Sequence, residues 1–215
     1  MPRQTQLDVV EKIEVCVATA LAISLVYAIG RSLIHQEWTV LFVSSLTLAL
    51  FYLPAAIERS LKIHLPVEVQ FVIVAFVYAS LFLGEVGGYY TRFWWWDLAL
   101  HTGSGIGFGF AGFIILYSLF AHAKIHASPF LLSMFAFCFS LAIGALWEMF
   151  EFAMDRFFGM NMQKSGLVDT MSDLIVDAIG ALVVSVLGFA YIKGVKPRFF
   201  ARVIRKFLNV DAEVC

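Results

Sequence analysis

The chain has 215 residues, of which 61% are hydrophobic and only 14% are charged, and its formal net charge is −1. A soluble domain has about half apolar and about 25% charged residues, so this composition excludes an ordinary soluble protein and predicts a polytopic membrane protein. We therefore expect membrane lipids as partners and no nucleic acid. Cys16, Cys138 and Cys215 are far apart, and neither a disulfide framework nor a thiolate zinc site is predicted.

Six apolar stretches are long enough to cross a bilayer, which takes about 20 helical residues. We expect an all-α protein with spans over approximately 12–30, 38–57, 67–84, 97–121, 129–154 and 170–192. Every backbone polar group in lipid must be satisfied within the protein, and no period-two alternation indicates a barrel, so the spans should be helices. Pro54 is expected to kink the second span near its end.

Basic residues predict the orientation of the spans. With six spans both termini lie on one side, which holds eleven of the 15 Lys and Arg residues: Arg3, Lys12, Arg59, Lys62, Lys124, Lys193, Lys196, Arg198, Arg202, Arg205 and Lys206. The other side holds Arg31, Arg92, Arg156 and Lys164. Both termini are therefore predicted to be cytoplasmic.

The chain is interpreted as one transmembrane domain, residues 1–193, followed by a basic cytoplasmic tail, residues 194–215. Residues 1–84 are expected to be mainly scaffold, because nearly all ionisable residues inside the spans fall within 90–192. In the tail, an apolar helical stripe lies beside basic residues: the stripe is Phe200, Val203, Ile204, Phe207 and Leu208, and the basic residues are Arg198, Arg202, Arg205 and Lys206. This pattern is typical of an amphipathic helix on anionic lipid. The alternative is a basic flank that only fixes the topology.

Ionisable residues recur at helical spacing in the last three spans. They are Asp97 and His101, then Glu148 and Glu151, then Asp169, Asp173 and Asp177. Steps of three or four residues put the members of each group on one face of a helix. Consecutive spans alternate in direction, so the three groups should meet at one membrane surface, which the predicted topology makes the extracytoplasmic one.

Charged groups inside a bilayer are costly and usually mark function. A helix cap formed by Thr170 and Asp173, or simple solvation of Asp155 and Asp169, would explain part of the pattern without a ligand. We predict a site for one or two divalent metal ions, with the ligands Asp97, His101, Glu148, Asp173 and Asp177. Carboxylates with one imidazole suit Mg, Mn, Zn or Fe. A proton relay among close carboxylates is the other physical solution.

Three further features accompany this group. Trp94, Trp95 and Trp96 are typical of an interfacial aromatic belt, or form a platform for a lipid chain. The loop over 155–168 is long enough to close over the site as a lid. Glycines of the fourth span permit close helix packing, either within the chain or in a homo-oligomer: Gly103, Gly105, Gly107, Gly109 and Gly112.

The three polar groups also form a familiar pattern. It reads Trp96-Asp97-x-x-x-His101-x-x-Ser104-Gly105, then Trp147-Glu148-x-x-Glu151, then Asp169-Thr170-x-x-Asp173-x-x-x-Asp177-x-x-Gly180. The pattern resembles the YjdF-like bacterial inner-membrane proteins and, more loosely, the VanZ-like group, in which a lysine stands in place of Leu98 and often an asparagine in place of Asp177. The resemblance covers about residues 90–190. It implies a multi-helix bundle in the bacterial inner membrane and points towards the cell envelope, but it implies no reaction.

Together these features predict a membrane-embedded, metal-dependent enzyme of the hydrolase or transferase type, acting on a lipid or lipid-linked substrate at the extracytoplasmic leaflet. Glu151 would be the general base, and Arg92 or Arg156 would meet an anionic headgroup. One alternative is a proton- or cation-coupled transporter that uses the same carboxylates. Another is a non-catalytic envelope protein whose polar cluster only fixes helix packing.

Overall fold

A computed structural model describes residues 9–61, 65–121, 125–195 and 197–208. Within these ranges, six helical stretches are long and apolar enough to cross a membrane: Lys12–His35, Trp38–Ser60, Val67–Val86, Trp96–Ala121, Pro129–Phe158 and Leu167–Ile192. The predicted all-α class and the six spans are therefore confirmed, and several spans extend a few residues beyond the predicted ends. Arg3, Lys62, Lys124 and Lys196, which enter the topology prediction, lie outside the described residues, as do residues 209–215 of the tail. The orientation in the membrane stays a prediction.

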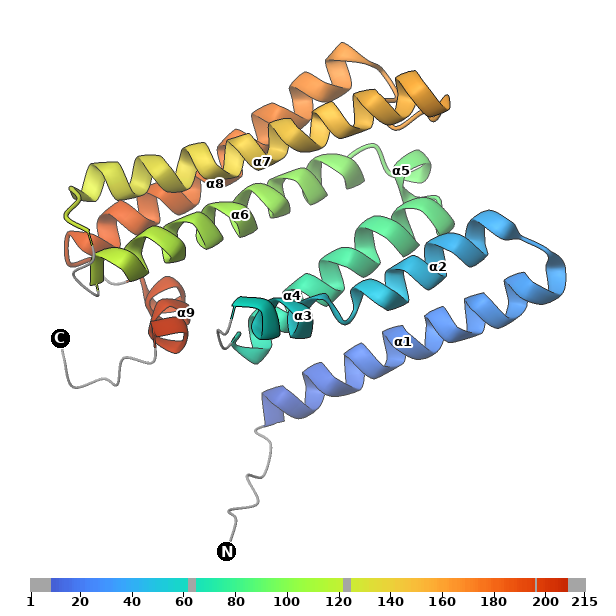
Figure 1. Ribbon diagram of the computed structural model, residues 1–215, viewed down its shortest axis with the longest axis horizontal. Helices are drawn as coiled ribbons and strands as arrows, with labels where there is room; N and C mark the ends of the chain where they lie inside the picture. Colours follow the sequence, from blue (N-terminus) through green and yellow to red (C-terminus); the bar gives the residue numbers. More distant parts are fainter. Residues whose placement is uncertain (1–8, 62–64, 122–124, 196, 209–215) are drawn as a thin grey trace, which may run out of the picture. The chain divides into compact units, whose positions relative to one another are not determined.

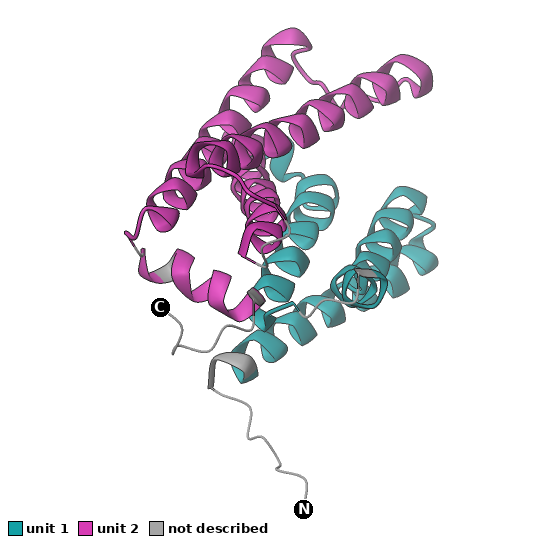
Figure 2. Cartoon of the chain, turned by 60° about the vertical axis from the view of Figure 1, so that its left-hand side comes forward, with its two compact units in different colours: residues 1–93 teal, residues 94–215 magenta. Residues whose placement is uncertain are grey.

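The chain divides into two compact units, residues 1–93 and residues 94–215 (Figure 2). The boundary falls close to the predicted division between the scaffold half and the half that carries the polar site. The prediction that residues 1–193 form a single domain remains a prediction.

The first unit contains the first three spans. Its elements are α1 (Val9–His35), α2 (Trp38–Leu50), α3 (Leu53–Leu61), α4 (Val67–Val77), the π-helix η1 (Tyr78–Val86) and α5 (Tyr89–Arg92). The second span is interrupted between α2 and α3, where the Phe51 and Tyr52 N–H groups turn back to the carbonyls of Leu48 and Ala49. Pro54 follows directly and has no N–H to continue the ladder, so the predicted kink is present. The buried Tyr78 hydroxyl lies 2.9 Å from the Ser24 hydroxyl of α1 and ties η1 to that helix.

The second unit is built on three long helices, α6 (Trp96–Ala121), α7 (Pro129–Phe158) and α8 (Leu167–Ile192), which lie side by side (Figure 1). α7 begins at a proline, and its N-cap Ser128 accepts a hydrogen bond from the Leu131 N–H. It ends at Gly159, which adopts the left-handed conformation with φ 65°. Because α7 runs opposite to its neighbours, the start of α6, the end of α7 and the start of α8 share one end of this unit (Figure 1).

Glycines bring α6 and α8 into backbone contact. A Cβ on Gly105 would lie 2.5 Å from the carbonyl oxygen of Asp177, and a Cβ on Gly180 would lie 2.6 Å from that of Thr102. Gly109 and Gly112 also face neighbouring helices closely, so the close packing predicted for the fourth span is confirmed for these positions. A Cβ on Gly103 or Gly107 would meet nothing within 4 Å, and the predicted homo-oligomer contact stays a prediction.

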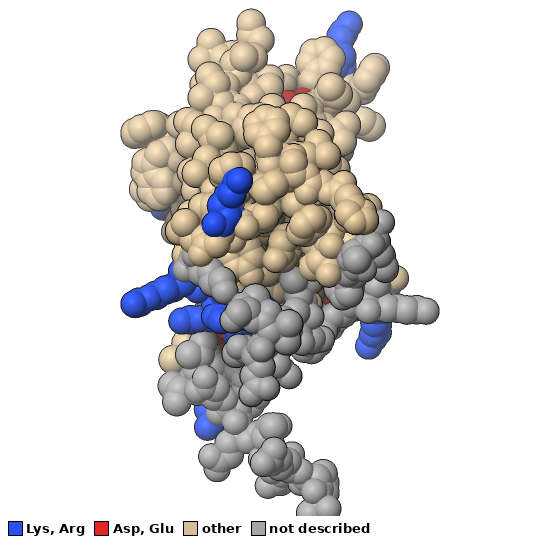
Figure 3. Space-filling model, turned by 90° about the vertical axis from the view of Figure 1, so that its left-hand side faces the viewer, with Lys and Arg blue, Asp and Glu red and all other residues tan. Residues whose placement is uncertain are grey.

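The short helix α9 (Arg198–Leu208) follows α8 and packs against the opposite end of the same bundle. Phe200 and Ile204 are 3% and 1% exposed and join a core cluster with Phe113, Ala136 and Val184. Of the apolar stripe predicted to lie on lipid, Phe200, Val203 and Ile204 are therefore buried against protein and Phe207 is half-buried, because the bundle offers these residues an apolar surface of its own. The side chain of Leu208 lies outside the described part of the chain. Figure 3 views the left-hand side of Figure 1, where Lys and Arg side chains project and hardly any described Asp or Glu atoms are visible.

The contact between α6 and α8 yields a matched pair of variants. Gly105→Ala forces a methyl group against the backbone of Asp177 and should destabilise the protein by about 1–3 kcal/mol, the usual cost of overpacking. Gly103→Ala on the same helix adds its methyl group in open space and should leave stability unchanged or slightly raised, since alanine favours helix. Thermal unfolding in detergent compares the two, and equal melting temperatures would contradict the backbone contact.

Candidate metal centre

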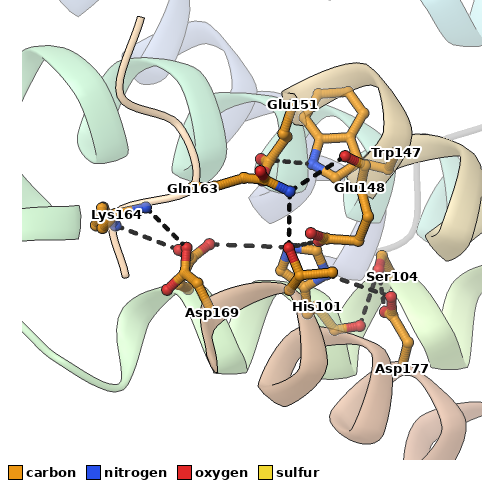
Figure 4. A network of polar contacts seen from close by, with 11 residues as sticks. His101, Ser104, Trp147, Glu148, Glu151, Gln163, Lys164, Asp169 and Asp177 are labelled. Atoms are coloured by element: carbon orange, nitrogen blue, oxygen red, sulfur yellow. Dashed lines mark hydrogen bonds and ion pairs between the residues drawn. The ribbon is translucent and has the colours of Figure 1, made fainter. Parts of the chain in front are cut away.

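His101 stands at the centre of a buried polar cluster at the end of the second unit where α6 begins. His101 is 7% exposed, and its ring lies between Asp177 and Glu148 (Figure 4). Nδ1 lies 3.3 Å from Oδ2 of Asp177. Nε2, on the other side of the ring, lies 3.8 Å from Oε1 of Glu148 and 3.9 Å from Oδ1 of Asp97. The imidazole therefore touches carboxylates from all three long helices.

Asp177 orients the imidazole from behind. This residue is 1% exposed, and its other oxygen accepts a hydrogen bond of 3.0 Å from the Ser104 hydroxyl. A Cβ on Gly144 of α7 would overlap the Asp177 carboxylate, so glycine leaves the space that this side chain fills. An ionised carboxylate only accepts, which places a hydrogen on Nδ1 of His101 and, in the neutral ring, a lone pair on Nε2.

Three residues of the cluster form a set called here the inner group: His101, Glu148 and Asp173. One ligand atom from each lies within 4.8 Å of the other two, and all three residues are buried. Glu148 is 4% exposed, and neither of its carboxylate oxygens has a hydrogen-bond partner among the described residues. At an effective dielectric of about 20, two carboxylates about 5 Å apart repel by roughly 3 kcal/mol. A bound cation or a proton has to offset this repulsion and the burial.

A second set of three residues, the outer group, adjoins the first and shares one member with it. Asp97, Asp169 and Asp173 each offer an oxygen within 4.8 Å of the others. Asp97 and Asp169 are half-buried. The Lys164 ammonium lies 3.2 Å from Oδ2 of Asp97, and the Lys164 backbone N–H donates to Asp169 at 3.1 Å. The outer group is thus more open than the inner group and already has one cationic neighbour.

The connection between α7 and α8 passes over this end of the bundle. Asp155 holds it by accepting hydrogen bonds from the backbone N–H groups of Met162 (2.7 Å) and Gln163 (2.8 Å). The Gln163 amide then donates to the Thr170 hydroxyl at 2.7 Å. The loop is shorter than predicted, because α7 continues to Phe158 and α8 begins at Leu167.

The remaining predicted site residues are Glu151, Arg156 and Arg92. Glu151 is half-buried and accepts a hydrogen bond from the Trp147 indole at 2.9 Å. Arg156 is exposed in the last turn of α7. Arg92 is exposed on α5, which belongs to the first unit. Their catalytic roles stay predictions.

Five predicted ligands do meet in one place, namely Asp97, His101, Glu148, Asp173 and Asp177, and Asp169 joins them. Asp177 belongs to neither the inner nor the outer group. It faces Nδ1 of His101, whereas Glu148 and Asp97 lie nearest to Nε2. Gln163 was not predicted from the sequence. Its signal is weak, a single amide residue in a loop that joins two acidic helix ends.

Comparisons with known proteins agree with a membrane location. The family model described as "Predicted membrane protein (DUF2238)" matches residues 14–194. An uncharacterised protein of Thermotoga maritima is 25% identical to the chain over 201 residues, which cover 89% of this chain and 95% of that protein. No solved structure gives a significant match.

The role of Asp155 in holding the loop is testable by proteolysis. Asp155→Ala removes the acceptor of two backbone N–H groups, so the loop should open and trypsin should cleave after Lys164 several-fold faster in detergent. Glu151→Ala, one turn earlier on the same helix, removes a carboxylate that accepts a hydrogen bond from the Trp147 indole and not from the loop residues Met162 and Gln163, and it should leave the cleavage rate unchanged. Mass spectrometry identifies the cut site. Equal rates in the two variants would show that Asp155 does not hold the loop.

Proposed function

We propose a metal-dependent function for this chain, which belongs to the membrane protein family DUF2238. A divalent ion would be held by the inner group, His101, Glu148 and Asp173. The observation that carries the proposal is the Glu148 carboxylate, which is buried without a hydrogen-bond partner among the described residues, beside a second buried carboxylate and an imidazole. A purely structural polar cluster would have to keep this carboxyl group protonated, whereas a bound ion would compensate the ionised form.

The inner group suits such an ion in spacing and in chemistry. Ligands of a tetrahedral ion with bonds of about 2.1 Å lie roughly 3.4 Å apart, close to the 3.8 Å between Nε2 of His101 and Oε1 of Glu148. One imidazole and two carboxylates favour Mg, Mn, Zn or Fe. Three protein ligands leave a coordination position open for water or substrate, as catalytic sites do and structural sites do not.

Asp177 takes a different part in this proposal from the ligand role expected from the sequence. It would hold Nδ1 of His101 and direct Nε2 towards the ion, with Ser104 fixing the carboxylate in turn. Such carboxylate–histidine–metal arrangements set the tautomer and the orientation of the ring. The buried position of Asp177 between α6, α7 and α8 supports this positioning role.

We further propose an enzyme of the hydrolase or transferase type that acts on a lipid or lipid-linked substrate. A divalent ion at this place would supply polarisation of a substrate oxygen or activation of water. Trp94 and Trp95, 83% and 43% exposed at the start of α6, are suited to the lipid interface. Glu151, half-buried on the face of α7 that carries Glu148, is the candidate base. Arg156, or Arg92, would meet an anionic headgroup.

The location of this activity follows from two sequence arguments. The excess of basic residues on the side of the termini places the site at the extracytoplasmic leaflet, and the resemblance to the YjdF-like proteins supports the bacterial inner membrane and a role in the cell envelope. The transport alternative has less support. The described core of the second unit beyond the site contains Phe113, Ala136 and Val184, and its buried polar side chains there are the hydroxyls of Ser133, Ser140 and Ser185, which bond to backbone carbonyls and are not ionisable.

The metal content of the protein tests the proposal directly. Purified chain supplied with Mn and Zn should retain about one tightly bound divalent ion, and Glu148→Gln or Asp173→Asn should lose it. Asp177→Asn should weaken the affinity by about 10–100-fold without abolishing binding, the usual effect of removing an outer-shell partner. Glu37→Gln, which changes a half-buried carboxylate beside Arg31 in the first unit, is the control. Wild-type protein that takes up no ion would sink the proposal.

The enzyme class is tested separately with lipids. Wild-type protein incubated with a bacterial lipid extract and Mn²⁺ should change one lipid class, detected by mass spectrometry, and EDTA or Glu148→Gln should slow this change by more than about 10²-fold. A metal-binding protein that alters no lipid, but that in proteoliposomes moves protons or cations along a gradient, would favour the transport alternative instead.

A further inference from the structure

We infer that the outer group, Asp97, Asp169 and Asp173, holds a second divalent cation, that Asp173 is shared between the two ions, and that the second ion displaces Lys164. This inference rests on the proposed function, because the first ion sits in the inner group. It adds to that function a second metal site, a weaker affinity for the ion at this second site, and phosphate esters as the substrate class.

The first step is the sharing of Asp173. An oxygen of its carboxylate lies within 4.8 Å of ligand atoms from His101 and Glu148, and an oxygen of the same carboxylate lies within 4.8 Å of oxygens from Asp97 and Asp169. A carboxylate has two oxygens and is able to bind one ion with each. Asp173 is therefore placed to join two ions as a bridge, with the first ion buried and the second nearer the surface.

The second step concerns the partners of Asp173 within the described part of the chain. The residue is 2% exposed. Among the described residues, no hydrogen bond and no ion pair within 4.0 Å engages its carboxylate, whereas the equally buried Asp177 binds both Ser104 and His101. Buried carboxylates are normally hydrogen-bonded or bound to metal. Asp173 therefore points to a ligand from the interior of the cluster, independently of the acidic residues at its edge.

The third step concerns charge. A divalent ion in the inner group would balance Glu148 and Asp173, but Asp97 and Asp169 would still share the single positive charge of Lys164. A second divalent ion balances both of these carboxylates. Lys164 is then no longer needed there, and its exposed position in the loop lets the ammonium move into solvent.

Two consequences follow. The second ion should bind more weakly than the first, because Asp97 and Asp169 are half-buried and Lys164 competes for them. Paired divalent ions also bind the two sides of a phosphoryl group and stabilise its attacking and leaving oxygens. The outer group therefore narrows the substrate class to phosphate esters, here of a lipid or lipid-linked molecule.

Manganese binding in detergent tests the inference, with chelator-treated full-length protein and Mn²⁺ alone as the probe. Equilibrium dialysis should find about two Mn²⁺ ions per wild-type chain at saturation, and low-temperature EPR should show a spin-coupled pair, as expected for ions about 4 Å apart. The double variant Asp97→Asn/Asp169→Asn should bind about one ion and lose the coupled signal.

The variant Lys164→Met tests the second site without removing a metal ligand. It should fill the second site at a Mn²⁺ concentration lower by on the order of tenfold, because it removes a competing positive charge. Lys193→Met, at the far end of α8 where the ammonium lies over the Phe189 ring, is the matched control and should leave both affinities unchanged.

The outcomes separate the two proposals. One ion in the wild type, unchanged in the double variant and in Lys164→Met, would overturn the second site and leave the first intact. A double variant that binds no ion would also overturn it, because Asp97 and Asp169 would then serve the first ion. No ion in the wild type would overturn the metal-dependent function itself.

Discussion

The closeness of α6 and α8 is the constraint on which the polar cluster depends. Gly105 lies against the backbone of Asp177, and Gly180 lies against that of Thr102. At this separation the short side chain of Asp177 reaches both Ser104 and Nδ1 of His101. Helices separated by larger side chains would leave His101 without its acceptor and Asp177 as an isolated charge in an apolar interior.

The same contact gives His101 two different sides. Behind the ring, Asp177 is fully satisfied by hydrogen bonds and acts as a fixed part of the helix packing. On the Nε2 side, the Glu148 oxygens are equally buried and have no hydrogen-bond partner among the described residues, and Asp173 lies in the same group. The cluster thus combines a completed half, which stabilises the fold, with an incomplete half, which is suited to a ligand. Further along the bundle the core around Phe113 is apolar, so this chemistry is confined to one end.

The meeting of the acidic groups was predictable, because helical spacing and alternating direction follow directly from the sequence. The different roles of Asp173 and Asp177 could not be predicted. Both lie on one face of α8, four residues apart. The rotation and separation of the helices decide that Asp177 contacts Nδ1 of His101 while Asp173 joins the inner group, and the sequence does not specify either. The burial of the apolar side chains of α9 against the bundle could also not be predicted from the sequence, since Phe200 and Ile204 would suit lipid and protein equally well. Gln163 was missed because loop contacts carry no periodic signal.

The distance along the chain between His101 and Asp177, 76 residues, has a bearing on how the protein is made. During synthesis α6 enters the membrane before its partner on α8 exists, and α7 follows with Glu148. His101 and Glu148, the buried ionisable residues of these two helices, therefore reach a lipid environment before the helix that completes their surroundings. The insertion machinery has to hold these spans until the last long helix arrives, and truncation before α8 would leave a chain that is poorly suited to remain in the bilayer.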